Sequence, residues 1–393
     1  MSKQVVLTGN YAAAEAAALC RPDVIAAYPI TPQSSVVERL AGKVYNGELD
    51  AEMIQVECEH SAMSAVQGAA AGGGRVFTAT SAQGLALMYE PYFRMSTLRL
   101  PMVMALATRE MTSPETVWSG QQDAMSVREA GWIQVFCEST QEIVDMIIQG
   151  YRLAEDSRVR IPVNVCYDGF YSSHLTEGVL IPDQAAVDAF LPNPAQSMKA
   201  VLDPDHPLSL DPLTAGPLLM KYRKNHLEAM EQALTVLEEI DAEFGKQFGR
   251  SYGGGIEKYR LDDADVVLVT IAGMSGTAKD AVDIARDRGI KAGLIRIRFT
   301  RPFPAARIAD ALAGKKAFSV IDRSCCFGWS QGPMHMEVKA ALADQGIHAC
   351  HFSTIGGLGG ADISLDEILG VIDILEKEKN QPGERPVHWL LKD

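Results

Sequence analysis

The sequence predicts an α/β protein with two doubly wound parallel-sheet domains. Apolar strand-like runs alternate with helical segments in the first half of the chain, and the alternation returns after an aperiodic stretch and a long helix. The run at residues 100–108 is apolar almost throughout, as expected for a parallel strand covered on both faces. The expected divisions are a first domain at 1–190, an extended linker and long helix at 191–255, a second domain at 256–375 and a C-terminal tail at 376–393.

The first domain shows strand and helix signals in regular succession. In order we expect strand 5–8, helix 11–19, strand 24–27, helix 36–44, a strand-like run ending before Glu57, a small-residue helix stopping at 72–74, strand 75–80, strand 100–108, a strand from Trp132, helix 141–155 and strand 162–167. From these seven strand-like segments we expect six parallel strands with helices between them. Thr31, Ser34 or Ser35 supplies a hydroxyl that can cap the helix at 36–44.

The second domain repeats the pattern after an extended connection at 191–217 and a long amphipathic helix at about 222–248. Strands are expected at 262–272, 291–299 and 317–322, with helices between them. Gly273 and Gly276 form half of a dinucleotide-binding fingerprint, which helix–strand packing explains better. The charged, proline-containing tail suits a segment laid on a partner or in solvent.

Composition limits the possible functions. The chain has 393 residues, 47% of them hydrophobic, and a formal net charge of −14 without a long basic run, which argues against nucleic acid or an anionic membrane as partner. Its first residues lead straight into a strand, and no uncharged apolar run is long enough to span a bilayer, so we expect a cytoplasmic protein. The seven cysteines lack metal-ligand spacing, so we expect reduced thiols and neither a metal nor an iron–sulfur cluster on this chain.

Two places combine charge with the end of a strand. Glu57, Glu59 and His60 precede a helix whose small residues allow very close packing. A plain preference of acidic residues for a helix N-terminus explains the two carboxylates equally well. Arg109 follows the apolar run at 100–108. At the end of a buried strand, we favour a guanidinium that binds a carboxylate or phosphate through two N–H groups. The alternative is a surface charge whose aliphatic stem packs against the protein.

Several stretches match one family together, in order and over nearly the whole chain. They are Leu-Thr-Gly-Asn-Tyr at 7–11, Tyr-Pro-Ile-Thr-Pro at 28–32, Glu-Cys-Glu-His-Ser-Ala at 57–62, Phe-Thr-Ala-Thr-Ser-Ala-Gln-Gly at 77–84, Arg109, and Arg-Pro-Phe-Pro at 301–304. In these motifs the chain resembles the α subunit of pyruvate:ferredoxin oxidoreductases of the four-subunit type and their 2-oxoacid relatives.

The resemblance implies a thiamine diphosphate pyrimidine-binding domain followed by a transketolase C-terminal-like domain. It implies a β subunit that carries the diphosphate- and Mg²⁺-binding domain, γ and iron–sulfur δ-type subunits, and a dimer of heteromers. Thiamine diphosphate would be shared with the β subunit, and the Mg²⁺ and iron–sulfur clusters would lie on partner subunits. The sequence agrees, because it contains no Gly-Asp-Gly…Asn-Asn pattern and no cluster-type cysteine spacing.

The resemblance also implies roles for individual residues. Glu59 matches the carboxyl group that donates or shares a proton with N1′ of the cofactor's aminopyrimidine ring, and Glu57 is its local rival. Thr31 and Arg109 match the hydroxyl and the bidentate cation that hold the substrate carboxylate.

Further side chains are implied around the cofactor. Pro29, Ile30 and Gln83 match cofactor-binding positions, together with Glu59. His60 and Ser61 line or brace the pocket, and an ordinary structural histidine explains His60 equally well.

The implied reaction is oxidative decarboxylation of a 2-oxoacid with coenzyme A to acyl-CoA, CO₂ and a reduced ferredoxin or other acceptor, with pyruvate as the default substrate. After Arg109 the chain reads Glu-Met-Thr-Ser-Pro-Glu-Thr-Val-Trp-Ser-Gly-Gln-Gln-Asp, whereas pyruvate and branched-chain relatives tend to carry an Ala-Met-Ala-Pro-Pro-like run and an acidic pair after the tryptophan. A branched-chain or aromatic 2-oxoacid such as phenylglyoxylate is therefore the first alternative. An NAD(P)-dependent Rossmann dehydrogenase and a non-catalytic scaffold subunit are the remoter ones.

Overall fold

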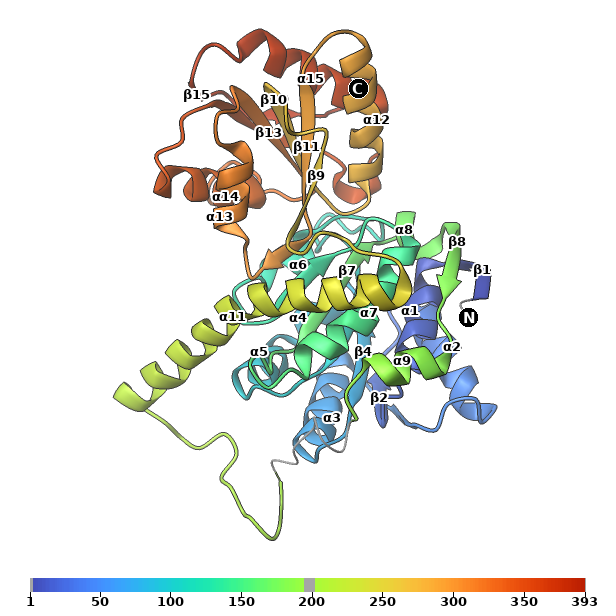
Figure 1. Ribbon diagram of the computed structural model, residues 1–393. Coiled ribbons are helices and arrows are strands. Elements are labelled where there is room, and N and C mark those ends of the chain that lie inside the picture. The colour runs from blue at the N-terminus through green and yellow to red at the C-terminus, as the bar shows by residue number, and fades with distance from the viewer. Residues whose placement is uncertain (1–2, 194–201, 393) are drawn as a thin grey trace.

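The computed structural model describes residues 3–193 and 202–392. Figure 1 shows two sheet-based lobes, one above the other, with the long helix α11 (Gly216–Phe248) lying across the lower lobe before the chain enters the upper one. Within the described residues, no helix has both the length and the apolar character needed to cross a bilayer.

The lower lobe is built on a seven-stranded sheet. Its strand order is β12 (Phe299–Arg301), β6 (Ile133–Phe136), β7 (Val163–Asp168), β5 (Val103–Thr108), β4 (Val76–Thr80), β2 (Val24–Ala27) and β3 (Glu52–Gln55). Strands β2 to β7 are parallel, which confirms six parallel strands. The seventh, β12, arrives from the second half of the chain and pairs antiparallel with β6, so the two lobes share a sheet.

The first strand, β1 (Lys3–Thr8), is not part of this sheet. We expected it to start the parallel sheet, but it pairs antiparallel with β8 (Thr176–Ile181) in a separate two-stranded ribbon. Leu7 is the one buried hydrophobic residue of β1. The strand is therefore mostly exposed, as expected for a ribbon on the outside of the sheet.

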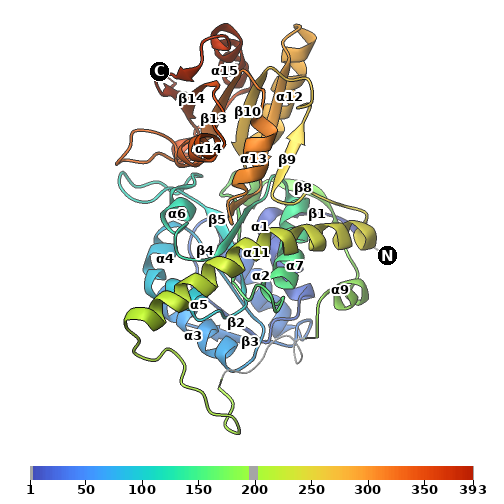
Figure 2. The same ribbon diagram turned by 60° about the vertical axis from the view of Figure 1, so that its left-hand side comes forward.

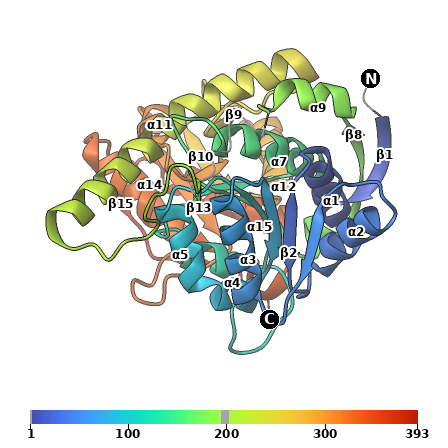
Figure 3. The same cartoon turned by 90° about the horizontal axis from the view of Figure 1, so that it is seen from below.

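Helices cover both faces of the lower sheet. One face packs against α1 (Gly9–Leu19), α2 (Ser34–Tyr45), α7 (Thr140–Ala154), α9 (Gln184–Phe190) and α11, and the other against α3 (Glu59–Ala71), α4 (Ala82–Leu87), α5 (Tyr89–Thr97) and α6 (Gln122–Ser126). The short helix α8 (Tyr171–His174) follows β7. Figure 3 shows the two helical layers from below, with α11 and α9 along one side and α3 and α4 along the other. The N-cap of α2 is Gln33, whose side chain makes no capping bond, so none of the three hydroxyl residues expected there caps the helix.

The upper lobe has its own seven-stranded sheet. Six strands follow the order β15 (Gly383–Glu384), β14 (Cys350–Ile355), β13 (Ala317–Asp322), β10 (Val266–Ile271), β11 (Ala292–Ile297) and β9 (Ile256–Tyr259), and β16 (His388–Trp389) also pairs with β14. Helices α12 (Met274–Asp287) and α15 (Leu365–Glu378) pack together, as do α13 (Ala305–Leu312) and α14 (Pro333–Asp344), and a 3₁₀ turn covers Leu358–Gly360. Figure 2 shows this lobe with α13 and α14 in front of the sheet.

Two details of the second half differ from expectation. Helix α11 begins at Gly216, earlier than expected, and residues 194–201 of the preceding connection lie outside the described residues. The tail is more ordered than expected, because α15 continues to Glu378 and β15 and β16 then pair with β14 of the chain's own sheet, while most residues from 381 to 392 stay exposed. The parallel strand β14 offers a free edge, and the tail pairs with it.

Candidate active site

Four neighbouring strands of the lower sheet end side by side, and a candidate residue follows each. Thr31 follows β2, Glu59 follows β3, Gln83 follows β4 and Arg109 follows β5, in the spatial order β5, β4, β2, β3. The chain passes from β2 outward to β3 and then returns to β4 on the other side of β2. Ligands of open α/β sheets bind at the carboxyl ends of the strands where the winding direction reverses. The four residues therefore gather at the usual binding edge of such a sheet.

Glu59 is the first residue of α3 and is 6% exposed. Burial raises the pKa of its carboxyl above the ordinary value, against a smaller opposite effect from its own backbone. It has no ion-pair partner among the residues that the structure describes. A buried acid that is not neutralised by a neighbour is suited to holding or moving a proton.

The surroundings of Glu59 fit a bound polar ring. A Cβ atom at position 84 would lie 2.7 Å from Glu59 Oε1 and 2.4 Å from Thr80 Oγ1, so only glycine fits there without displacing its neighbours. Thr80 Oγ1, which lies with Glu59 Oε1 beside Gly84, is buried without a hydrogen-bond partner in the described structure, and so are Gln83 Oε1 at the start of α4 and Gln33 Oε1 in the turn after β2. Such orphaned groups cost ~1–3 kcal/mol each, which suggests that a ligand supplies their partners. The residues present thus fit a polar heterocycle such as an aminopyrimidine.

Glu57, the rival carboxylate, lies in a different environment. It is exposed and accepts a 2.5 Å hydrogen bond from Ser61 Oγ, which lowers its pKa. His60 points outward as well, with Nε2 3.2 Å from Glu90 Oε2. Glu57, His60 and Ser61 therefore pair with one another or with Glu90 near the surface, and within the described residues no hydrogen bond or ion pair joins His60 or Ser61 to Glu59.

Arg109 and Thr31 are in direct contact. Arg109 is 4% exposed, and its guanidinium donates to the carbonyl oxygens of Thr31 and Thr116, each at 2.8 Å. Its Nη2 and the amide of Gln83 both donate to Glu115 Oε1, at 3.3 and 3.4 Å. Burial lowers the pKa of Arg109, and Glu115 and Asp123 oppose that effect. Arg109 and Gln83 thus already hold one carboxylate between them, although that carboxylate belongs to an exposed side chain.

Pro29 and Ile30 occupy the turn that carries Thr31. They are exposed and half-buried, and the Ile30 carbonyl accepts a 2.9 Å hydrogen bond from the Gln33 N–H. The turn is held from behind by Asn10, which donates to the Pro32 carbonyl at 2.6 Å and accepts from Tyr167 Oη at 2.9 Å. The buried Asn10 fixes the turn and thereby places Thr31 beside Arg109.

Sequence reasoning missed the acid that organises these turns. Asp123 is fully buried and accepts hydrogen bonds from the backbone N–H groups of Ala82, Arg109 and Ala124 at 2.8–3.0 Å. Burial raises the pKa of its carboxyl to about 7 despite these bonds. Glu110 also has a pKa raised to about 7 by burial, and its Oε1 is buried without a hydrogen-bond partner. Their one signal in the sequence is their position in the loop after a buried strand.

The glycine turn of the upper lobe does not cradle a dinucleotide. The Gly273 N–H donates at 2.9 Å to Oδ2 of Asp168, the last residue of β7, and Arg323 Nη1 lies 2.7 Å from Asp168 Oδ1. A carboxylate of the lower lobe therefore occupies the place where a pyrophosphate would bind. Gly273 is needed for this close approach, because a Cβ there would lie 2.8 Å from Asp168 Oδ2.

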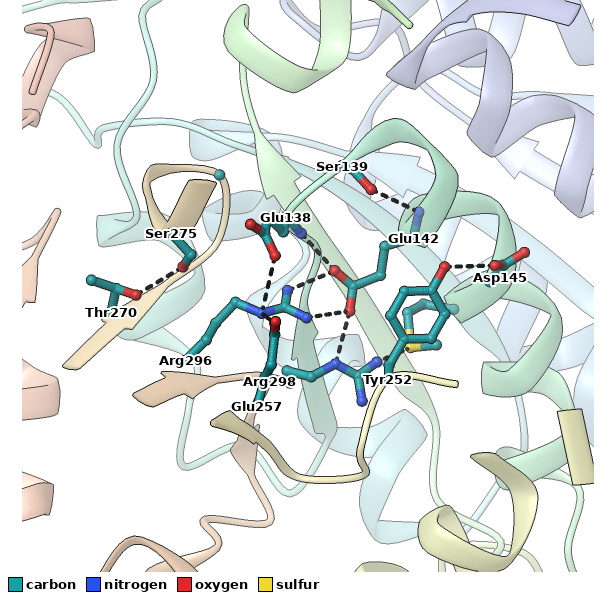
Figure 4. A network of polar contacts seen from close by, with 12 residues as sticks. Glu138, Ser139, Glu142, Asp145, Tyr252, Glu257, Thr270, Ser275, Arg296 and Arg298 are labelled. Carbon is teal, nitrogen blue, oxygen red and sulfur yellow. Dashed lines mark hydrogen bonds and ion pairs between the residues drawn. The ribbon is translucent and has the colours of Figure 1, made fainter. Parts of the chain in front are cut away.

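A buried ion-pair network also joins the lobes, beside a cavity of about 810 Å³. Figure 4 shows Glu142 of α7 between Arg296 and Arg298, with hydrogen bonds of 2.6, 3.1 and 2.8 Å. The two arginines lower the pKa of Glu142 to about 2 against the effect of its burial. Glu257 and Glu138 lie 2.8 and 3.4 Å from Arg296. This network fixes the upper lobe to α7.

Two family profiles match the chain, one over most of the lower lobe and one over most of the upper lobe. The family profile described as "Pyruvate flavodoxin/ferredoxin oxidoreductase, thiamine diP-bdg" matches residues 15–242, and "Pyruvate:ferredoxin oxidoreductase core domain II" matches residues 264–368. The chain is 47% identical over 95% of its length to the α subunit of NADH-dependent phenylglyoxylate dehydrogenase of Aromatoleum evansii, covering 91% of that protein. It is 45% identical over 97% of both chains to pyruvate synthase subunit PorA of Methanocaldococcus jannaschii. It is 39% identical to ketoisovalerate oxidoreductase subunit VorA of Pyrococcus abyssi, over 98% of this chain and 96% of that one.

Solved structures share the fold. A 2-oxoglutarate:ferredoxin oxidoreductase from Magnetococcus marinus superposes with a TM-score of 0.75 at 20% identity, over 96% of this chain and 65% of that one. A split-gene transketolase superposes with a TM-score of 0.55 at 10% identity, over 95% and 99% of the two chains. Both likenesses confirm the expected α/β architecture.

Proposed function

The chain belongs to the pyruvate flavodoxin/ferredoxin oxidoreductase family, and on that premise we propose that it is the catalytic α subunit of a thiamine diphosphate-dependent 2-oxoacid:acceptor oxidoreductase. The observation that carries the proposal is Glu59, a buried acid with a raised pKa at the binding edge of the sheet. The reaction would convert a 2-oxoacid and coenzyme A into acyl-CoA and CO₂ and deliver electrons to a ferredoxin or similar acceptor.

Glu59 would hold the aminopyrimidine ring of the cofactor. When bound, thiamine diphosphate supplies a nucleophilic carbon and an electron sink for decarboxylation next to a carbonyl group. The task of Glu59 is to keep a proton at N1′ of that ring, for which a raised pKa in a water-poor place is the favourable condition. Gln83 and the turn of Pro29 and Ile30 would complete the walls around the ring.

Arg109 and Thr31 would hold the carboxylate of the 2-oxoacid. Support comes from Glu115, whose carboxylate lies 3.3 Å from Arg109 Nη2 and 3.4 Å from the Gln83 amide. Glu115 is 71% exposed in its side chain and lies on a loop, so a substrate carboxylate can replace it. Fixing the carboxylate before bond cleavage is a positioning role, which lowers the entropic part of the barrier.

The active site would be completed by another chain. The relatives are named as subunits, which indicates a heteromeric complex. The edge at Glu59 and Thr31 binds one end of the cofactor, and a β subunit would hold the diphosphate and its Mg²⁺. Iron–sulfur clusters would lie on γ and δ-type subunits, in a dimer of heteromers.

The substrate class has two candidates. Pyruvate is the default, in line with the pyruvate synthase relatives. An aromatic or branched 2-oxoacid is favoured by the 47% identity to the phenylglyoxylate dehydrogenase subunit, and by the loop after Arg109 that departs from the pyruvate pattern. A panel of pyruvate, 2-oxoisovalerate and phenylglyoxylate on the purified complex, scored by CO₂ release and acyl-CoA formation, decides between them.

The proposed function is tested with Glu59→Gln in the assembled complex. The amide keeps the size of the side chain but not the proton-holding acid, so we expect decarboxylation to fall by ~10²–10⁴-fold with assembly intact. Glu57→Gln is the matched control, and we expect it to retain activity because Glu57 is exposed and bonded to Ser61. Full activity of Glu59→Gln would contradict the proposal and would favour a scaffold subunit or a different class of enzyme.

A further inference from the structure

Three side chains of the upper lobe converge outside the candidate active site. His335 of α14, His351 of β14 and Glu384 of β15 each offer a ligand atom, and these atoms lie within 4.8 Å of one another. His351 and Glu384 are register partners on adjacent parallel strands, and His335 Nε2 lies 3.7 Å from Glu384 Oε1. Three separate elements therefore bring one carboxylate and two imidazoles to a single point.

Buried ring nitrogens of both histidines lack a hydrogen-bond partner in the described structure. His335 is fully buried, and neither of its ring nitrogens has a hydrogen-bond partner in the described structure. His351 Nδ1 is likewise buried and unpartnered. An orphaned buried polar group costs ~1–3 kcal/mol, and the contact of 3.7 Å to Glu384 is too long for a hydrogen bond. The site as it stands is incomplete.

One fully buried aromatic ring backs both imidazoles. The rings pack against Phe318, which is fully buried, with centroid distances of 5.2 Å for His351 and 6.2 Å for His335. This apolar wall fixes the ring planes and keeps water from the nitrogens on that side.

We propose that His335, His351 and Glu384 form a binding site for a divalent transition-metal ion, with Zn²⁺ the ion that this ligand set suits best. Ligands at ~2.0–2.2 Å from a tetrahedral zinc ion are ~3.3 Å apart. The 3.7 Å contact between His335 Nε2 and Glu384 Oε1 is close to that separation, and the other pairs of ligand atoms, all within 4.8 Å, would have to approach by at most ~1.5 Å. A water molecule fills the fourth position from the adjoining cavity of about 340 Å³, which His351 and Lys339 help to line.

Lys339 and Gln331 would compete with a metal ion for Glu384, since the Gln331 amide also donates to Glu384 Oε1. The Lys339 ammonium lies 3.0 and 3.2 Å from the two oxygens of Glu384 and 3.3 Å from Gln331 Oε1. The Lys339 side chain is 32% exposed, so it can turn into solvent when a metal ion takes its place beside Glu384. Removing Lys339 should therefore strengthen metal binding.

A metal ion at this site would hold the C-terminal segment against the sheet. Glu384 belongs to the two-residue strand β15, which otherwise contributes little pairing to β14. A metal ion bound to Glu384 and to two residues of the lobe's core would fix this segment to the sheet. Binding energy of the metal ion then adds to the stability of the docked tail.

The test uses the assembled complex with Zn²⁺ alone as the probe. After equilibrium dialysis, elemental analysis should find one more zinc ion for each α chain in the wild type than in His351→Gln. His348→Gln is the matched control, because His348 lines the same cavity but is outside the cluster, and it should bind as much zinc as the wild type. Lys339→Met should bind zinc about fivefold more tightly, the equivalent of ~1 kcal/mol for a partly exposed ion pair.

A structural readout accompanies the metal count. Zinc should slow amide hydrogen exchange at residues 383–389 in the wild type and leave it unchanged in His351→Gln. Equal zinc content in the wild type and His351→Gln would overturn the proposal and leave an ordered water as the partner of the two imidazoles. Weaker zinc binding by Lys339→Met would also overturn it, because the ammonium would then be part of the site.

Discussion

Replacing Glu142 by glutamine tests how the two lobes are held together. Glu142 is 1% exposed and lies between Arg296 and Arg298. Arg296 keeps contacts with Glu257 and Glu138 when the charge of Glu142 is lost. Among the described residues, Arg298 has no other carboxylate partner, so the substitution leaves it buried without a counter-charge.

The magnitude follows from the pKa of Glu142. The carboxyl has a pKa of about 2 in the folded chain and an ordinary value of 4.5. Each pH unit between these values is worth ~1.4 kcal/mol, which gives ~3 kcal/mol of stabilisation at neutral pH. Removing one member of a buried ion pair costs ~3–5 kcal/mol in general, so the two arguments agree.

The sign of the pH dependence is also fixed. Because the folded-state pKa is depressed, this stabilisation is fully present above pH 4.5 and is lost as the pH falls through about 2. The difference between wild type and Glu142→Gln should therefore be constant near neutral pH and shrink in strong acid.

Hydrogen exchange of the assembled complex measures the effect. Peptides from α7, β11 and β12 should exchange ~10²-fold faster in Glu142→Gln than in the wild type at pH 7, the equivalent of ~3 kcal/mol. Asp188→Asn is the control, since it removes an ion pair with Arg21 whose side chains are 42% and 59% exposed. Such exposed pairs are worth ~0–1 kcal/mol. If the two variants exchange alike in these peptides, the buried network does not hold the lobes.

Three further predictions concern the candidate active site. Gly84→Ala should abolish most turnover with assembly retained, because the new Cβ would lie 2.4 Å from Thr80 Oγ1 and 2.7 Å from Glu59 Oε1; unchanged kcat would refute the tight fit. Arg109→Lys should lower kcat/KM by ~10–100-fold, mainly through KM, because the two-pronged contact is lost, and an unchanged KM would remove Arg109 from the substrate site. Asp123→Asn should lower the thermal midpoint, since an amide nitrogen would face a backbone N–H at a cost of ~1–3 kcal/mol; an equal midpoint would mean that other contacts hold these turns.

Local signals in the sequence suffice for much of the fold. Strand β5 is apolar at every position except its last residue, Thr108, and is buried at every position, so its place inside a parallel sheet could be predicted from residues 103–108 alone. The resemblance placed candidates after β2, β3, β4 and β5, and these are neighbours in the sheet. Parallel topology brings the ends of such strands to one edge, which is why motifs far apart in sequence meet there.

Pairings between distant segments could not be predicted. Strand β1 pairs with β8, and β12 leaves the upper lobe to pair with β6, and neither choice has a local signature. The residues Glu115 and Asp123 were missed for a similar reason. Glu115 lies in a loop without periodicity and Asp123 in the short helix α6 that follows it, and only folding brings Glu115 to Arg109 and Asp123 to three backbone N–H groups.

The account depends most on the place of Glu59, and a structure of the assembled complex with thiamine diphosphate tests it directly. The measured quantity is the distance from the Glu59 carboxyl to N1′ of the aminopyrimidine ring. The account predicts a hydrogen bond of ~2.6–3.2 Å, with Gly84 and Gln83 against the ring. A ring beyond hydrogen-bond reach of Glu59, or one whose N1′ faces Glu57, would contradict it.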